Sequence, residues 1–458
     1  MNFDKINNVY LVGIGGIGMS ALARYFKHLG KFVAGYDKTP TTLTGQLQSE
    51  GIDIHFEDSL LLMPPNILSQ KDSTLVIYTP AVPNYNYEFN YFRERGYELV
   101  KRAEVLGFIF SKLKGVAVAG THGKTTISTM IAHILNKSSV GCNAILGGIS
   151  KNYNSNLLLS TKSDIIVTEA DEYDRSFLKL FPYVGIVTSV DADHLDVYGT
   201  HEEVIKSYNQ FIKQISENGI LIYKKGIPLS LEGLKDIEIY TYSAYELADF
   251  YPLNIRLKKD VFHYDVQTPQ GVIKDIILGV QGKMNLENSI AALAAATVLN
   301  VSAEEIKAGL ASFEGVKRRF EYHIKSSKIT YIDDYAHHPE ELKACIMSAR
   351  NLFPDKKITG IFQPHLYTRT RDFAVGFAES LSLLDELILL DIYPAREEPI
   401  EGVTSEIIFK NVKISNKIMC NKSELMNKLG TLKPEILITM GAGDIDTFVE
   451  PIKKLYNK

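Results

Sequence analysis

The segment 116–126 constrains the fold of this chain more than any other part of the sequence. Four small apolar residues, Val-Ala-Val-Ala, are typical of a buried strand, and Gly120 and Gly123 then make a tight turn. A Lys-Thr-Thr triplet opens the segment 127–135, whose apolar residues have helical spacing. A strand, a glycine turn, a Lys-Thr pair and a helix predict a phosphate-binding loop, in which backbone N–H groups and the positive helix end meet the anion.

The spacing of this loop is unusual. The common P-loop has four residues between its glycines, whereas here only Thr121 and His122 separate them. Lys124 adds positive charge, and the hydroxyl of Thr125 is a candidate Mg²⁺ ligand. A chance Gly-Lys-Thr in a surface loop is the alternative, but the position between a buried strand and a helix argues against it.

Length and composition restrict the remaining possibilities. A chain of 458 residues is too long for one core and predicts two to four domains. The hydrophobic fraction of 45% and the charged fraction of 23% are typical of a soluble globular protein. With 50 basic and 54 acidic residues the net charge is −4, and there is no basic run, so we expect no nucleic acid and no membrane as partner.

The three cysteines lie far apart and form neither a metal-binding pattern nor an even disulfide set, which favours a reducing, cytoplasmic location. The apolar run 9–23 resembles a signal peptide, but its glycines favour a strand and turn instead. No stretch is long enough for a membrane helix.

The first predicted domain, 1–112, opens with a glycine-rich fingerprint. An apolar strand, 9–13, leads into Gly13-x-Gly15-Gly16-x-Gly18, and Asp37 ends the next predicted strand. This is the pattern of a loop that approaches a pyrophosphate closely, with an acid at the end of the second strand. A further strand, 75–78, ends in a rigid loop that begins at Thr79. Loops at this end of an open α/β sheet bind ligands.

The second predicted domain, 113–313, contains the phosphate-binding loop. Two further buried strands, 165–168 and 184–189, are followed by acidic segments that contain Glu169 and His194. Acids at the ends of neighbouring strands can converge on one metal ion, although a solvated acidic loop is the simpler interpretation. Residues 255–266 alternate in a way that predicts a hairpin, and residues 281–288 precede an alanine-rich helix over 289–299.

The third predicted domain, 314–458, again alternates strands with helices. Strands are expected at 329–332, 358–362, 386–391 and 435–439, so the fold class is α/β with doubly wound, mostly parallel sheets. At the domain boundary, 317–321, a cluster of cations could offset charge on a transferring phosphoryl group. His337 and His338 either bind substrate or cap a turn before Pro339.

These motifs together resemble the Mur ligases, the ATP-dependent amide-forming enzymes of peptidoglycan synthesis, over essentially the whole chain. The resemblance implies a Rossmann-like first domain that binds a UDP-sugar without NAD, a central ATPase-type domain and a Rossmann-like third domain. It implies ATP and Mg²⁺, with Mn²⁺ as an alternative metal. Within the family, the chain looks most like the branch that adds L-alanine to UDP-N-acetylmuramate, through an acyl phosphate, as a cytoplasmic monomer or homodimer.

The resemblance also assigns residues to roles. The catalytic residues would be Lys124, His194, Arg319 and His338. The ATP-binding residues would be Gly120, Thr121, His122, Gly123, Lys124, Thr125, Thr126, Asn285, Asn288, Arg319 and Asp334. The metal ligands would be Thr125, Glu169 and His194. The substrate-binding residues would be Gly13, Gly15, Gly16, Gly18, Asp37, Thr79, Tyr335, His337, His338, Arg369 and Arg371.

The chain departs from the family pattern at two positions and leaves alternatives open. Leu366 stands where many members have an arginine, and Met284 replaces a histidine. The acidic segment at 169–174 also resembles a sister enzyme that ligates a whole tripeptide, but the opening loop favours alanine addition. An NAD-dependent oxidoreductase would leave the loop at 120–126 unexplained, and a non-catalytic nucleotide-binding scaffold would release no ADP.

Overall fold

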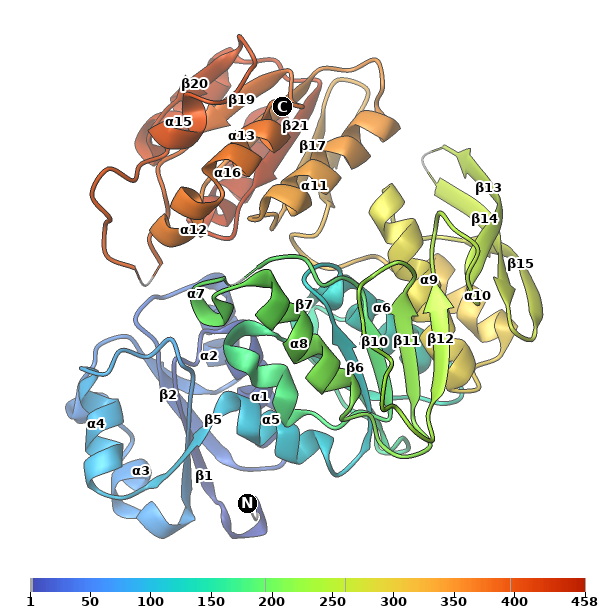
Figure 1. Ribbon diagram of the computed structural model, residues 1–458. Coiled ribbons are helices and arrows are strands. Elements are labelled where there is room, and N and C mark those ends of the chain that lie inside the picture. The colour runs from blue at the N-terminus through green and yellow to red at the C-terminus, as the bar shows by residue number, and fades with distance from the viewer. Residues whose placement is uncertain (1–2, 194, 260, 396, 458) are drawn as a thin grey trace. The chain divides into compact units, whose positions relative to one another are not determined.

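The computed structural model describes residues 3–193, 195–259, 261–395 and 397–457. The chain divides into two compact units. The first contains residues 1–257, 262–279 and 287–314, and the second contains residues 258–261, 280–286 and 315–458. Figure 1 follows the chain from the N-terminus in blue to the C-terminus in red.

The first sheet has the strand order β3-β2-β1-β4-β5, and all its neighbouring strands are parallel. Its strands are β1 (Asn8–Val12), β2 (Phe32–Tyr36), β3 (Asp53–His55), β4 (Thr74–Tyr78) and β5 (Glu98–Lys101). Its helices are α1 (Ile17–His28), α2 (Thr42–Ser49), α3 (Pro65–Ser69), α4 (Tyr87–Glu94) and α5 (Arg102–Phe110). Alternate residues of β1 enter two separate apolar cores, because both faces of a parallel sheet are covered.

The second sheet has the order β12-β11-β10-β6-β9-β7-β8, which is parallel except for the β7–β8 pair. Its strands are β6 (Lys114–Ala119), β7 (Asn143–Ser150), β8 (Ser155–Leu158), β9 (Ile165–Ala170), β10 (Val184–Val187), β11 (Ile220–Lys224) and β12 (Glu238–Tyr242). The helices of this region are α6 (Lys124–Lys137), α7 (Leu195–Tyr198), α8 (His201–Ile212), α9 (Lys283–Val298) and α10 (Ala303–Ser312).

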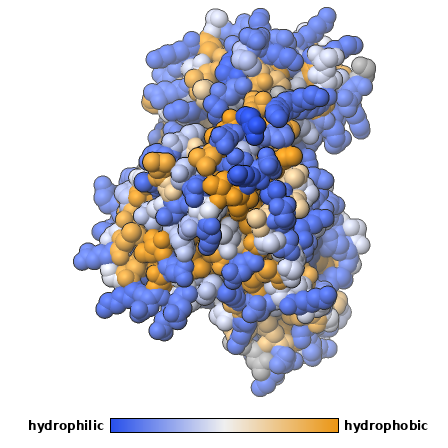
Figure 2. Space-filling model, turned by 90° about the vertical axis from the view of Figure 1, so that its right-hand side faces the viewer, coloured by the Kyte–Doolittle hydropathy of each residue, from blue (hydrophilic) through white to orange (hydrophobic). Residues whose placement is uncertain are grey.

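A small sheet follows in the order β13-β14-β15, with strands β13 (Tyr251–Lys258), β14 (Val261–Thr268) and β15 (Gly271–Ile277). Strands β13 and β14 form at the place of the predicted hairpin, whereas β15 was not predicted. Exposed apolar residues lie on both outer strands, Ile255 and Leu257 on β13 and Val272 and Ile277 on β15. Figure 2 faces the side on which these strands lie and shows apolar side chains scattered among hydrophilic ones.

The sheet of the second unit has the order β16-β17-β21-β18-β19-β20, and only β16 is antiparallel to its neighbour. Its strands are β16 (Glu321–Lys325), β17 (Thr330–Asp334), β18 (Ile358–Phe362), β19 (Glu386–Leu389), β20 (Lys417–Met419) and β21 (Ile436–Met440). Its helices are α11 (Pro339–Leu352), α12 (Tyr367–Asp372), α13 (Ala374–Leu381), α14 (Glu406–Phe409), α15 (Lys422–Thr431) and α16 (Val449–Tyr456). Separate apolar clusters cover the two faces of this sheet.

The predicted α/β class with mostly parallel sheets is confirmed, while the domain boundaries at 112 and 313 stay predictions. One element was placed wrongly: the alanine-rich helix begins at Lys283, so Asn285 and Asn288 lie within α9 rather than before it. The apolar residues that predicted the helix begin further along the chain, whereas the helix itself already starts in the polar segment before them. Among the described residues, no helix combines the length and apolar character that crossing a bilayer would need.

Candidate active site

The predicted phosphate-binding loop joins β6, at the centre of the second sheet, to α6. Gly123 lies in the left-handed region with φ +81° and precedes the first turn of the helix, which favours glycine there. Gly120 also has positive φ, and a Cβ at this position would lie 2.0 Å from Oγ1 of Thr188. The unusual spacing of the two glycines therefore fits the close approach of the neighbouring strand β10.

Hydroxyl groups that follow β10 hold the loop in place. Oγ of Ser189 lies 2.8 Å from Oγ1 of Thr121 and accepts a hydrogen bond from the backbone N–H of His122 at 3.0 Å. Nε2 of His122 lies 3.3 Å from a carboxylate oxygen of Asp191. Thr121 and His122, which were predicted to bind ATP, therefore lie on the loop itself. Ser189 holds both of them, and the sequence analysis did not single it out.

The ammonium group of Lys124 is buried in its own loop. It donates to the carbonyl oxygen of Gly120 at 2.7 Å and to the carboxylate of Glu172 at 2.9 Å. Burial disfavours the charge on Lys124, but Glu172 and Asp171 outweigh burial and raise its pKa. Burial raises the pKa of Glu172 to about 7 against the opposing effect of Lys124. An incoming phosphate would compete with Glu172 for the lysine.

Two predicted metal ligands lie next to each other. Oγ1 of Thr125 donates to the carboxylate of Glu169 at 2.7 Å, at the carboxyl ends of β6 and β9. The third predicted ligand, His194, lies outside the described residues. Within the described ranges, no three His, Cys, Asp or Glu side chains are grouped as a metal cage. A hydroxyl and a carboxylate are hard oxygen ligands, and they fit Mg²⁺, which keeps several of its waters.

Glu169 has room only because residue 147 of β7 is a glycine. A Cβ at Gly147 would lie 1.8 Å from Oε1 of Glu169. The sequence analysis missed this residue, since nothing in the local pattern of β7 shows that β9 is its neighbour.

The fingerprint loop of the first sheet is built on similar close contacts. The carboxylate of Asp37 accepts a hydrogen bond from the N–H of Gly15 at 2.8 Å. A Cβ at Gly13 would lie 2.7 Å from Cγ2 of Thr79. The structure therefore brings Gly13, Gly15, Asp37 and Thr79 together. Gly16 is the N-cap residue of α1, and Gly18 lies in the first turn of that helix.

A missed arginine lies between this loop and the acidic segment after β9. Nη1 of Arg102 would be 2.6 Å from a Cβ at Gly18, and Nη2 lies 3.6 Å from the carboxylate of Asp171. Arg102 begins α5 and is only partly exposed. It therefore links the two loops that carry the fingerprint and the acidic cluster.

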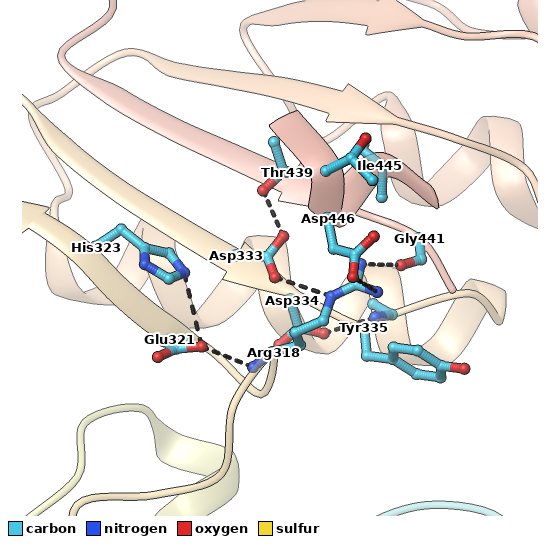
Figure 3. A network of polar contacts seen from close by, with 12 residues as sticks. Arg318, Glu321, His323, Asp333, Asp334, Tyr335, Thr439, Gly441, Ile445 and Asp446 are labelled. Carbon is cyan, nitrogen blue, oxygen red and sulfur yellow. Dashed lines mark hydrogen bonds and ion pairs between the residues drawn. The ribbon is translucent and has the colours of Figure 1, made fainter. Parts of the chain in front are cut away.

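In the second unit, Arg318 is bound within a polar network (Figure 3). Its Nε donates to Asp333 at 3.0 Å and its Nη2 to the carbonyl oxygen of Gly441 at 2.6 Å. Asp333 is fully buried and also accepts from Thr439. The guanidinium lies over the ring of Tyr335. Arg318 thus joins the carboxyl ends of β17 and β21, which is a structural task.

Arg319, the predicted phosphate-contacting arginine, is held more loosely. Its Nη1 lies 3.7 Å from Oε1 of Glu341, and its guanidinium lies over the ring of Tyr335, 5.3 Å from the ring centroid. The other oxygen of Glu341 accepts from the N–H of His337 at 3.0 Å and of His338 at 3.3 Å. The structure therefore groups Arg319, His337 and His338 around one carboxylate, and the ring of Tyr335 lies against Arg319 and His337.

The two alternatives for the histidine pair can now be compared. His338 is the N-cap residue of α11, and its Nδ1 accepts from the N–H of Glu340 at 3.4 Å. His337 lies against the ring of Tyr335 and 6.2 Å from that of His365. His338 thus caps α11 through Nδ1, and substrate binding stays a proposal for both histidines.

Asp334 lies at the end of β17 and is almost completely buried. Its carboxylate accepts from the N–H groups of Phe320 and Ala336, each at 2.7 Å. Burial raises its pKa to about 6, against the lowering effect of Arg319 and these two hydrogen bonds. Arg319 is thus close enough to affect the charge of Asp334, and the shared ATP contact predicted for them stays a prediction.

The remaining predicted residues are distributed over both units. Asn288 lies beside the phosphate-binding loop, 3.0 Å from the position of a Cβ at Gly123, whereas Asn285 donates to Gln281 in the second unit. Arg369 and Arg371 lie on α12, and Arg371 is exposed and donates to its neighbour Asp372. Arg371 thus shares a short helix with Arg369 and has its own neighbour Asp372 as an ion-pair partner.

The site combines a glycine loop that carries a lysine, a hydroxyl–carboxylate pair and a parallel sheet. This combination defines a nucleotide phosphate-binding α/β enzyme. Three family models match the chain. Residues 8–114 match the Mur ligase family catalytic domain, 118–296 the Mur ligase middle domain and 318–443 the Mur ligase glutamate ligase domain. The chain belongs to the Mur ligase family.

Curated relatives match over the full length. A UDP-N-acetylmuramate–L-alanine ligase from Parabacteroides distasonis is 53% identical and covers 100% of this chain and 99% of its own length. One of the same name from Flavobacterium johnsoniae is 48% identical, with 100% of both chains covered. Both the family and the branch suggested by the sequence are thus found among these relatives.

Solved structures agree with the fold. A UDP-N-acetylmuramate–alanine ligase from Thermotoga maritima has a TM-score of 0.82 at 26% identity and covers 98% of this chain and 99% of its own. A murein peptide ligase from Psychrobacter arcticus has a TM-score of 0.73 at 21% identity, covering 98% of each chain, and is similar in fold.

The close contact between Gly147 and Glu169 leads to a test. We expect Gly147→Ala to weaken the binding of Mn²⁺, used in place of Mg²⁺ with ADP present, roughly ten-fold or more, because the added methyl group displaces the carboxylate. Electron paramagnetic resonance measures the free Mn²⁺. Gly45→Ala, where a Cβ meets nothing within 4 Å, is the control. Unchanged Mn²⁺ affinity would remove Glu169 from the metal site.

The buried carboxyl of Asp334 leads to a second test. Its folded pKa of about 6 exceeds the ordinary value of 3.8 for an aspartate, so the free energy of unfolding falls as pH rises from about 4 to 6 and is then constant. The loss is on the order of 2–3 kcal/mol. Asp334→Asn should lack this decline, so its stability relative to wild type should be higher at pH 7.5 than at pH 4.5. Urea unfolding at pH 4.5 and 7.5 measures the free energy of unfolding of both proteins. The expectation would be contradicted if this free energy differed between wild type and variant by the same amount at both pH values.

Proposed function

We propose that this chain joins L-alanine to the lactyl carboxylate of UDP-N-acetylmuramate and converts ATP to ADP and phosphate. The observation that carries the proposal is the full-length match, at 53% identity, to a relative of that name. The phosphate-binding loop, with Lys124 and the Thr125–Glu169 pair at its end, supplies the chemistry that such a reaction needs.

The reaction has two steps. A carboxylate oxygen of the sugar attacks the γ-phosphorus of ATP and ADP leaves, which gives an acyl phosphate. The neutral amine of alanine then attacks the acyl carbon, the C–O bond to phosphate breaks, and the nitrogen releases one proton as the amide bond forms. Both first-step reactants are anions, so fixed positive charge must offset their repulsion. Lys124 supplies it when the phosphates replace Glu172 as its partner.

Thr125 and Glu169, with His194 as the third predicted ligand, would hold Mg²⁺ or Mn²⁺. The metal would add positive charge next to the phosphates and orient them. Arg319, Asp334, Asn285 and Asn288 are proposed ATP contacts. The glycine loop that Asp37 holds is proposed to take the diphosphate of UDP, and Tyr335, His337 and Arg369 to contact the amino acid.

We propose the cytoplasm as the compartment, with small molecules as the substrates. The three cysteines are free thiols, and all three are buried. A monomer and a homodimer both remain open, because no residue so far placed in the site is required from a second copy.

The acceptor identifies the branch of the family. Phosphate release with ATP, Mg²⁺ and UDP-N-acetylmuramate should be fastest with L-alanine, slower with glycine and L-serine, and near background with the murein tripeptide. A methyl group in an apolar pocket discriminates by roughly 10- to 200-fold, so glycine should lose at least ten-fold in kcat/KM. Preference for the tripeptide would transfer the chain to the recycling branch, and binding of NAD(H) without any response to the UDP-sugar would overturn the proposal.

The lysine tests the phosphate-binding loop itself. Lys124→Ala should reduce turnover by at least about 100-fold, because one preorganised cation at the transferring phosphoryl group is lost. The dissociation constant of UDP-N-acetylmuramate, measured by calorimetry, should change by less than about two-fold. Lys137→Ala removes a lysine from the other end of the same helix and should keep full turnover. Surviving turnover in Lys124→Ala would show that the loop was assigned wrongly.

A further inference from the structure

The start of α1, just after the glycine loop of the first sheet, is hydrogen-bonded to a side chain of the second sheet. Helix α1 follows this loop and packs against both β7 and β8. Six consecutive residues of α1, 19–24, are buried, so the helix has apolar or polar partners all round. Strand β8 is the antiparallel edge strand of an otherwise parallel sheet. Its Asn156 is the residue that reaches the loop.

Asn156 is fully buried, and both ends of its amide are bound to α1. Its Nδ2 donates to the carbonyl oxygen of Ile17 at 2.7 Å and to Oγ of Ser20 at 3.0 Å. Its Oδ1 accepts from Nη1 of Arg24 at 2.5 Å. Ile17 lies between Gly16 and Gly18, so the first of these bonds ends on the fingerprint loop itself.

Arg24 is in turn fixed from the other side. Its Nε and Nη2 both donate to the carboxylate of Glu50, at distances of 2.7 to 3.1 Å. Only about 8% of the Arg24 side chain is exposed. A guanidinium held by two partners in this fork geometry has little freedom, so it fixes the orientation of Asn156 as well.

The surrounding core joins the two sheets through apolar contacts. Leu11 of β1, Ile145 of β7 and Ile166 of β9 belong to one continuous apolar cluster. Apolar contact is non-directional, so it depends less on the exact orientation of its groups than a hydrogen bond does. The hydrogen bonds of Asn156 are directional, and they define one position of the glycine loop relative to the second sheet.

We propose that Asn156 is a positioning residue for the ligation. It holds the glycine loop, and with it the diphosphate of the UDP-sugar, at a fixed position relative to the phosphate-binding loop. The inference rests on the proposed function, because it supposes that the sugar's carboxylate must reach ATP bound at the other loop. A misplacement of about 1 Å can reduce the rate on the order of 100-fold.

The test separates binding from chemistry. Asn156→Ala should lower kcat roughly 30- to 100-fold. The dissociation constants of UDP-N-acetylmuramate alone and of Mg-ADP alone, measured by calorimetry, should change less than about three-fold, since each loop stays intact in its own sheet. A merely structural role would move the binding constants and kcat together.

The chain offers a matched control in the same hairpin. Asn143 of β7 is also buried, but its amide bonds only to Ser160, Ser163 and Ile165 within the second sheet's own region. Asn143→Ala should therefore leave kcat within about three-fold of wild type, even where its melting temperature falls as far as that of Asn156→Ala. An equal loss of kcat in both variants would overturn the proposal.

A second variant covers the case in which Asn156→Ala does not fold. Asn156→Asp can still accept from Arg24 but cannot donate to Ile17, so it should lose kcat to a similar extent while the ion pair supports the fold. A kcat of Asn156→Asp within about three-fold of wild type would contradict the inference.

Hydrogen–deuterium exchange distinguishes failure of this inference from failure of the proposed function. If the wild type released no ADP with UDP-N-acetylmuramate and L-alanine, the proposed function would be wrong. The contact itself is tested by amide exchange in the first turns of α1, which should be faster in Asn156→Ala and unchanged in Asn143→Ala. Exchange that is equal in both variants would show that Asn156 does not hold the loop.

Discussion

The candidate active site depends on the parallel pairing of β6 with β9 on one side and β10 on the other. In parallel strands the carboxyl ends lie at one edge, so three loops that are far apart in sequence meet there. The loop after β6 carries Lys124 and Thr125, β9 ends with Glu169, and β10 is followed by Ser189. A change of strand order would separate the hydroxyl, carboxylate and ammonium groups, whatever their local sequences.

The charges at this edge are balanced within the protein itself. Lys124 could not be buried alone, and Glu172 provides the opposite charge inside the same unit. In the second unit, Arg319 lies close to Glu341 in a similar way, although at 3.7 Å and with more exposure. Both cations that the proposed reaction uses therefore have carboxylate partners. If the nucleotide binds as proposed, its phosphates would replace a carboxylate as the partner of each cation.

The parts of this arrangement that sequence predicted are those with a local signal. Glycine loops, acids at strand ends and helical periodicity are each readable within about a dozen residues, and they sufficed for the α/β class and for placing Thr125 beside Glu169. Gly147 and Asn156 have no such signal. Each matters because of a residue on another strand or helix, Glu169 and Ile17 respectively, and only the register of the folded chain brings them together.

Adjacent residues of the same type show this limit most clearly. Composition cannot distinguish Arg318 from Arg319, or Asp333 from Asp334, yet the structure gives each a different task. Successive residues of a strand point to opposite faces, so Asp333 meets Arg318 and Thr439, while Asp334 accepts the N–H groups of Phe320 and Ala336. Arg318 and Asp333 are bound in the sheet's own network (Figure 3), whereas contact of Arg319 and Asp334 with ATP stays a proposal.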